Sequence, residues 1–293
     1  MPLVSLKEML LKAQKEKYAV PAFNVENMEM LQAVIQAAED LASPVILQTT
    51  PSTIRYGSMG LYASMTSCLA VSSRAPIALH LDHGDSYDIC LQAMRAGYSS
   101  VMIDGSKLPL TENIKLTSKI TEMANALDIP VEGELGLVGG REDSVMSTCP
   151  AYTDPDEAAE FVTKTGVFSL AISIGTSHGV YSGTPKLDME RLSAIAGKIP
   201  NPLVLHGTSG VPDSDVKECV RRGICKVNYA TDLRIAFTNG IKEAMRSHPD
   251  AFDPRVYLKA GRKKVYEEAR YKLQATSYKL QVVTYAVHAH PSP

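Results

Sequence analysis

Three histidines in the sequence share a local pattern that is typical of a metal site. Each is followed directly by glycine; they are His83, His178 and His206. Neutral imidazoles bind zinc, and three protein ligands leave an open position, which indicates a catalytic rather than a structural ion. A neighbouring glycine lets the backbone approach a metal or ligand closely. One buried histidine alone is more often a satisfied core group, whereas three in this pattern favour a shared zinc ion.

Two carboxylates could work beside such an ion. Asp82 directly precedes His83 and is a candidate general acid/base; the competing interpretation is an orienting partner of a ligating histidine. Glu134 is a candidate for an alternative metal ligand, and a structural ion pair is its main competitor. His80, two residues before Asp82, is expected to support the site without binding metal.

Three further segments add candidate functions. The charged stretch 136–144 (GLVGGREDS) is hinged by glycines and is typical of a mobile active-site lid. Segments 207–210 (GTSG) and 228–231 (NYAT) could bind phosphate through backbone amides. A loop with a helix cap would look similar at one position, but finding both after the last two expected strands favours phosphate.

The elements that must position these residues follow a repeating pattern. Short runs rich in Val, Ile and Leu alternate eight times with segments of helical periodicity. The expected strands cover 19–24, 45–48, 77–82, 100–104, 131–134, 169–174, 203–206 and 225–228, and the expected helices 27–41, 57–72, 86–96, 111–127, 155–165, 187–197, 213–222 and 232–247. This order predicts an α/β fold, a closed (β/α)8 TIM barrel, whose active site lies at the carboxyl ends of the strands.

The whole chain is compatible with one barrel domain over 1–280 that includes an extra charged helix over 255–280. The tail 281–293 has no assignable role, and chain ends of this kind are common places for disorder. With 45% hydrophobic residues, 21% charged residues and a net charge of -2, the 293-residue chain offers no electrostatic reason to bind nucleic acid or a membrane.

Targeting signals and cysteine usage point to a reducing compartment. Neither a signal-peptide segment nor a run of transmembrane length is evident, and the five cysteines contain no C-x-x-C pair. An odd number of cysteines disfavours a disulfide framework, so we expect a cytoplasmic protein.

Six motifs in order resemble the class II, zinc-dependent ketose-bisphosphate aldolases over about residues 5–278. They are residues 19–24 (AVPAFN), 80–83 (HLDH), 102–106 (MIDGS), 131–136 (VEGELG), 174–179 (IGTSHG) and 203–207 (LVLHG). The resemblance implies that the three His-Gly histidines bind zinc and that Asp82 is the acid/base acting on the C4 hydroxyl. Glu134 matches a carboxylate associated with alternative metal positions. The implied reaction is retro-aldol cleavage of a ketose 1,6-bisphosphate to dihydroxyacetone phosphate and glyceraldehyde 3-phosphate.

The resemblance also implies a set of substrate contacts and an oligomer. Positions that match the family's binding of the dihydroxyacetone phosphate half, often with a monovalent cation nearby, are Gly179, Gly207, Ser209, Asn228 and Thr231. Arg255 matches a residue that reaches the other phosphate across a dimer interface, so a homodimer or homotetramer is expected. Asn24, at the end of the first strand, is a further candidate substrate contact. Glu142, on the predicted lid, is expected to exchange the carbon-bound proton of the product half.

Within the family the sequence is more similar to tagatose-1,6-bisphosphate aldolases, through 153–155 (TDP), 182–188 (SGTPKLD) and 226–231 (KVNYAT). Tagatose bisphosphate is therefore the favoured substrate, and fructose bisphosphate, which differs only in the configuration at C4, is the alternative. Three departures from the family pattern could change substrate choice: Gly84, Thr208 and Tyr229.

Three other functions are compatible with parts of the pattern. A non-catalytic or regulatory barrel subunit would not need the three His-Gly pairs, although tagatose aldolases can require a related partner protein. A zinc hydrolase would leave the phosphate segments unexplained. A Schiff-base aldolase would need a strand-end lysine, and the lone strand lysine, Lys226, lies two residues before its strand's end.

Overall fold

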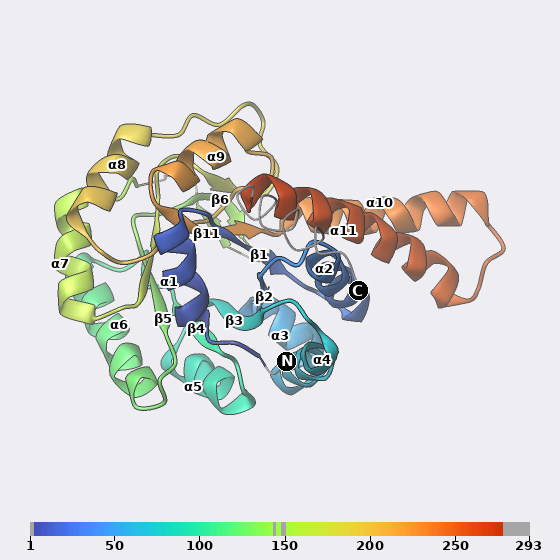
Figure 1. Cartoon of the computed structure of the whole chain (residues 1–293), viewed down its shortest axis with the longest axis horizontal. Helices are drawn as coiled ribbons and strands as arrows, with labels where there is room; N and C mark the ends of the chain where they lie inside the picture. The colour runs from blue at the N-terminus through green and yellow to red at the C-terminus, as the bar shows by residue number, and fades with distance from the viewer. Residues whose placement is uncertain (1–2, 143–144, 148–150, 278–293) are drawn as a thin grey trace, which may run out of the picture.

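The computed structural model describes residues 3–142, 145–147 and 151–277, which form a closed barrel of eight parallel strands (Figure 1). The strands are β1 (Val20–Asn24), β2 (Val45–Thr49), β3 (Ile77–Gly84), β4 (Ser100–Ile103), β5 (Val131–Leu135), β8 (Ser169–Ile172), β10 (Leu203–Leu205) and β11 (Ile224–Tyr229). Their order around the barrel is β1-β11-β10-β8-β5-β4-β3-β2. Every residue of these strands except His83 is buried, because helices cover the outside of the barrel. The predicted (β/α)8 barrel is confirmed.

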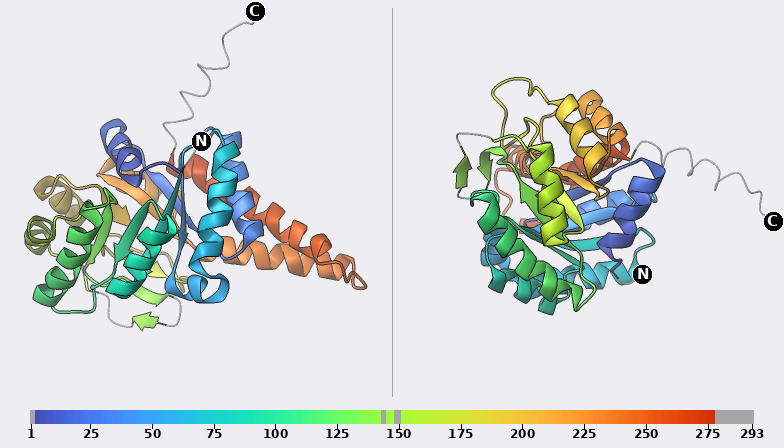
Figure 2. Two further views of the ribbon diagram at one scale, coloured as in Figure 1. Left: turned by 90° about the horizontal axis from the view of Figure 1, so that it is seen from below. Right: turned by 90° about the vertical axis from the view of Figure 1, so that its left-hand side faces the viewer.

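Eight helices that follow the barrel strands form the outer layer (Figures 1 and 2). They are α2 (Met28–Asp40), α4 (Met59–Ser72), α5 (Tyr87–Ala96), α6 (Leu110–Asn125), α7 (Pro155–Thr165), α8 (Met189–Lys198), α9 (Asp213–Arg221) and α10 (Thr231–Ser247). Side chains of Asn27, Ser86 and Asp154 cap the first turns of three of them. Gly97 and Gly166, both in the left-handed region, end α5 and α7.

The predicted helix 57–72 is wrong at its start. A separate short helix, α3 (Pro51–Gly57), comes first; Thr50 caps it and Pro51 occupies its first turn. Ser58, with φ 74°, interrupts the helical conformation between α3 and α4. Its hydroxyl then accepts the amide of Leu61 and starts α4. The periodicity of the segment alone did not reveal this interruption.

The N-terminal amphipathic stretch is a helix, α1 (Leu6–Glu16). It buries Leu6, Leu10 and Ala13 together with inward-facing residues of the first strands, among them Val20 and Ala22. The amide of Val4, just before α1, bonds to the carbonyl of Ile77 at the start of β3. The helix therefore closes the end of the barrel at which the strands begin.

The predicted extra helix is α11 (Pro254–Thr276), which pairs with α10 in a long hairpin that projects from the barrel (Figure 1). The two helices approach closely at Gly240 and Gly261, where an added Cβ would lie 2.6 Å from the Ala260 carbonyl and 2.7 Å from the Phe237 ring. The predicted tail 281–293 lies outside the described residues. No helix among those described is long and apolar enough to span a bilayer.

A small second sheet lies beyond the carboxyl ends of the barrel strands. We call it the rim sheet; it comprises β6 (Gly139–Glu142), β7 (Val145–Ser147) and β9 (Ser177–His178). Strand β6 pairs antiparallel with β7 and parallel with β9, so that Gly140 lies opposite His178. The segment predicted as a lid thus contains β6, which is bonded to the stretch that carries His178.

Candidate functional site

Asp82 and His83 face the same space because β3 contains a bulge. Neighbouring residues in a regular strand point to opposite faces. Here Leu81 pairs with Val101 and Gly84 with Ile103, so two residues of β3 lie opposite one of β4. His83 takes a positive φ of 48° within this bulge. A Cβ on Gly84 would overlap the carbonyl oxygen of Met102, which explains a glycine after this histidine.

The three histidines singled out by sequence converge at the carboxyl end of the barrel. Each offers a ring nitrogen within 4.8 Å of the nitrogens offered by the others. The ring centroid of His83 lies 5.4 Å from that of His178 and 4.7 Å from that of His206. His83 comes from β3, His206 directly follows β10, and His178 belongs to the rim sheet. Three elements distant in sequence therefore bring their imidazoles to one point.

Hydrogen bonds fix which nitrogen of two rings faces that point. His83 Nδ1 lies 2.9 Å from Asp104 Oδ2, and His206 Nε2 lies 2.9 Å from Glu132 Oε1. Carboxylates only accept hydrogen bonds, so these two nitrogens carry the protons. The other two nitrogens, His83 Nε2 and His206 Nδ1, then carry no proton. They lie 2.9 Å apart, with their lone pairs directed at the space between the rings.

Such a pair of lone pairs fits a cation held between the rings. Zinc bonds imidazole nitrogen at about 2.0–2.1 Å and accepts three neutral histidines. Burial, with the nearby His83 adding to it, lowers the pKa of His206 well below its ordinary value, so the ring is neutral as a ligand must be. The residues present therefore fit a divalent metal ion.

Asp82 is held beside the histidines by three side-chain amides. Its Oδ2 accepts from Asn24 Nδ2 at 2.8 Å and from Gln48 Nε2 at 3.2 Å, and its Oδ1 accepts from Asn228 Nδ2 at 3.3 Å. The side chain is almost fully buried, and Oδ1 lies 3.9 Å from His83 Nε2. A carboxylate fixed in this way can exchange a proton with a molecule bound at the histidines. Gln48, which sequence reasoning noted only as a strand end, is part of this clamp.

Glu134 belongs to a different group from the three histidines. Its Oε2 lies 3.7 Å from His83 Nδ1, on the side of the ring that faces Asp104. Burial would raise the pKa of Asp104, but hydrogen bonds from His83 and Ser106 outweigh it and hold the pKa well below its usual range. The geometry thus provides an alternative ligand set, His83, Asp104 and Glu134, that uses the opposite nitrogen of the shared histidine.

A buried ion pair beneath His206 was missed by the sequence analysis as part of the site. Glu132 Oε2 accepts from Lys226 Nζ at 2.9 Å, and both side chains are fully buried inside the barrel. The available signal was strand parity. Glu132 lies two residues before Glu134, and Lys226 two residues before Asn228, so each faces the same interior as its inward-facing neighbour.

The predicted phosphate positions gather around a small pocket of about 20 Å³ next to the histidines. The pocket is lined both by these positions and by the acid/base candidate. The lining residues are Asn24, Asp82, His178, Gly179, Gly207, Thr208, Ser209, Asn228, Ala230, Thr231 and Arg234. Gly207 has φ 64°, and a Cβ there would lie 2.8 Å from the backbone of Ser177. Sequence reasoning missed Arg234, which extends from α10 and bonds through Nε to Glu26 Oε1 at 2.6 Å. Arg234 brings a positive charge to this pocket.

Arg255, another predicted site residue, lies away from this pocket. Arg255 lies in the first turn of α11 at the hairpin, its side chain is 89% exposed, and it pairs with Asp253 at 2.8 Å. It does not line the pocket of its own chain. The backbone of Glu142 ends β6, and its side chain lies outside what the structure describes.

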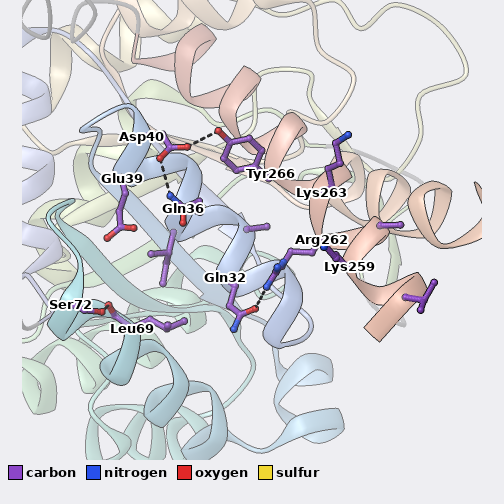
Figure 3. A pocket seen from close by; sticks show the side chains of 14 residues that line it. Gln32, Gln36, Glu39, Asp40, Leu69, Ser72, Lys259, Arg262, Lys263 and Tyr266 are labelled. Atoms are coloured by element: carbon purple, nitrogen blue, oxygen red, sulfur yellow. Dashed lines mark hydrogen bonds between the residues drawn. The ribbon is translucent and has the colours of Figure 1, made fainter. Parts of the chain in front are cut away.

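A larger groove of about 780 Å³ lies elsewhere, between α2, α4 and α11 (Figure 3). Lys259, Arg262 and Lys263 of α11 line it together with Glu39 and Asp40 of α2, and Arg262 bonds across it to Gln32 of α2. None of the candidate catalytic or metal-binding residues lines it. Its size alone gives no reason to place the chemistry there.

Comparisons with known proteins agree with these features. The family model described as class II fructose-bisphosphate aldolase matches residues 4–279. The D-tagatose-1,6-bisphosphate aldolase subunit GatY of Klebsiella oxytoca is 44% identical over 259 residues, which cover 88% of this chain and 91% of that protein. The crystal structure of the YdjI aldolase from Escherichia coli K12 is similar with a TM-score of 0.83 and 35% identity, over 94% of this chain and 97% of that one. A fructose-bisphosphate aldolase from Campylobacter jejuni is similar with a TM-score of 0.80 and 25% identity, over 94% and 95%.

Proposed function

Because the chain belongs to the class II fructose-bisphosphate aldolase family, and is thus a carbon–carbon lyase, we propose that it is a zinc enzyme that cleaves and forms tagatose 1,6-bisphosphate. The products of cleavage would be dihydroxyacetone phosphate and glyceraldehyde 3-phosphate. The observation that carries the proposal is the convergence of three imidazoles beside a carboxylate that three amides hold. The preference for tagatose is supported by the 44% identity to GatY.

His83, His178 and His206 would hold the zinc ion. When bound there, zinc supplies Lewis-acid stabilisation of the negative charge that develops as the C3–C4 bond breaks. Glu134, with Asp104, would offer an alternative position for the ion.

Asp82 would perform the proton transfer. It removes the proton of the C4 hydroxyl during cleavage and returns it during condensation. Because Asn24, Gln48 and Asn228 each donate to it, the carboxylate is already oriented before substrate binds. Glu142, on the rim sheet, would exchange the carbon-bound proton of the dihydroxyacetone phosphate half.

The phosphate of that half would bind where Gly179, Gly207, Ser209, Asn228 and Thr231 line the pocket. Helix α10 begins at Thr231, so its free amides and positive dipole end favour an anion there. Arg234 adds a charge, and a monovalent cation could bind nearby.

Arg255 would serve the other phosphate in a neighbouring copy. Its position on the projecting hairpin is compatible with a homodimer or homotetramer in which the hairpin of one chain reaches the site of another (Figure 1).

An assay of both bisphosphates on one purified sample, with bound metal measured in parallel, tests the proposal. We expect about one zinc per chain, cleavage of tagatose bisphosphate in preference to fructose bisphosphate, loss of cleavage with a chelator and recovery with zinc. Equal or faster cleavage of the fructose epimer would contradict the substrate. Full activity in chelator without bound metal would contradict the zinc mechanism. A metal-free chain that is inactive until a partner protein is added would indicate a subunit role.

A further inference from the structure

The ion pair beneath His206 forms a continuous chain of contacts to the metal site. Lys226 Nζ donates to Glu132 Oε2, and Glu132 Oε1 accepts from His206 Nε2, each over 2.9 Å. All three side chains are at most 1% exposed. No substrate or solvent contact is therefore needed to explain how His206 is held.

This chain of contacts selects one tautomer of His206. A carboxylate bonded to an ammonium group has only acceptor atoms to offer. His206 Nε2 must therefore be the donor, which leaves Nδ1 unprotonated and directed at His83 Nε2. The opposite tautomer would place a proton on Nδ1, the nitrogen that faces the ion. It would also bring two hydrogen-bond acceptors, His206 Nε2 and Glu132 Oε1, within 2.9 Å of each other.

Folding stability gives little reason for this arrangement. Removing two charges from water costs several kcal/mol per ion, and apolar replacements of a buried pair are often neutral or stabilising. The layer just around it shows that the barrel interior accepts apolar side chains, because Met102, Ala171 and Val204 form a small cluster there.

We propose that Glu132, fixed by Lys226, is a positioning residue that holds His206 with Nδ1 toward the metal ion. The inference rests on the proposed role of His206 as a ligand. Partners of this kind around ligating histidines typically change metal affinity by about 10–100-fold.

The test removes both charges together, because a single substitution would leave one buried charge unpaired and could unfold the chain. In the double variant Glu132→Gln/Lys226→Met, the amide can donate or accept, so both tautomers of His206 are tolerated. We expect zinc affinity, measured by competition with a chelator, to fall by about 10–100-fold. The absorption spectrum of the cobalt-loaded variant should also differ from that of the native chain.

A matched control removes a second ion pair, which lies outside the barrel and joins a buried lysine to a partly buried aspartate. Lys272 Nζ and Asp232 Oδ2 are also 2.9 Å apart, and Lys272 is 8% exposed. The variant Asp232→Asn/Lys272→Met should keep native zinc affinity and the native cobalt spectrum. Native affinity and an unchanged spectrum in the Glu132/Lys226 variant would overturn the inference. A native chain that binds no zinc would overturn the proposed function instead.

The unmodified chain offers a second test that does not depend on the variant folding. Side-chain ¹⁵N NMR of histidine-labelled, metal-free protein should show His206 protonated at Nε2, with the resonance assigned through its loss in His206→Gln. Protonation at Nδ1 would overturn the inference.

Discussion

Two regions of the molecule supply the three histidines by different physical means. The barrel interior provides His206 and His83, whose rings are bonded to the carboxylates of Glu132 and Asp104. The rim sheet provides His178, whose backbone is fixed by pairing with β6 and whose side chain, like that of His83, is partly buried. Two of the histidines are thus oriented by side-chain hydrogen bonds to carboxylates of the barrel, whereas the strand that carries the third is placed by backbone pairing with β6.

This difference indicates which ligands of the site are held rigidly and which can move. Ligands whose hydrogen bonds are satisfied inside a packed barrel are preorganised, which favours metal binding and proton transfer. A ligand on a small outer sheet can shift with the segment to which it is paired. The stretch around β6 and the metal site are therefore expected to respond to each other.

The largest effect is expected at Asp82, which belongs to the rigid interior. The variant Asp82→Asn keeps the size of the side chain but cannot exchange the C4 hydroxyl proton. Turnover should fall by about 10²–10⁴-fold, while zinc content stays near that of the native chain. Steady-state kinetics and metal analysis of one sample check this. Loss of zinc in the variant would show that Asp82 mainly positions a ligand.

Gly140→Ala tests the rim sheet. Gly140 has φ 87°, and an added Cβ would overlap the backbone of His178 across the β6–β9 pairing. We expect zinc affinity to fall about tenfold, since this is the lower end of the range for disturbed support of a ligand. The free energy of unfolding in urea should change little, because the barrel is untouched.

Gly183→Ala is the matched control for that variant. Its added Cβ would meet nothing within 4 Å. Zinc affinity should stay native in this protein. If Gly140→Ala also kept native affinity, the rim sheet would not position His178.

The sequence predicts the barrel well because each of its strands is a short buried segment that contains Val, Ile or Leu and lies between helical segments. It does not reveal where α3 ends, since that break depends on the single positive φ of Ser58. Nor does it reveal β6, β7 and β9, whose short segments have no strand periodicity. Pairing between residues 139–140 and 177–178 is a long-range contact that no local pattern encodes.

The candidate site was predictable as a set of residue types at strand ends, but not as a geometry. Sequence placed Asp82 and His83 side by side, whereas the bulge that turns both inward appears only in the pairing of β3 with β4. Glu132 was overlooked, and Lys226 was considered only as a Schiff-base lysine, because both lie one layer below the strand ends and their contact joins residues 94 positions apart. Arg234 was overlooked because it lies in the first turn of α10, beyond the strand end at which the sequence reasoning looked for site residues.

Arg234→Met tests the pocket in which the phosphate would bind, since Arg234 lines it. Loss of one charged contact to phosphate should raise KM by about tenfold and leave kcat within about twofold. The control is Arg222→Met, since Arg222 also pairs with a glutamate, Glu218, at 2.7 Å, but on α9 outside the pocket. An unchanged KM in Arg234→Met would assign phosphate binding to the backbone amides alone.

The smallest expected effect is on the pH dependence of folding stability, which tests whether water reaches His80 in the barrel interior. Burial, with the Lys226 ammonium adding to it, lowers the pKa of His80 well below its ordinary 6.5. The native ring then stays neutral at mildly acidic pH while the unfolded chain takes up a proton, so stability falls as pH falls below 6.5. Between about pH 7.5 and 5.5 this should cost about 1.4 kcal/mol of unfolding free energy. Urea unfolding at both pH values should show a smaller loss in His80→Gln than in the native chain. Equal losses in the two proteins would mean that His80 accepts a proton within the fold, and the contrast between a dry interior and an adjustable rim would weaken.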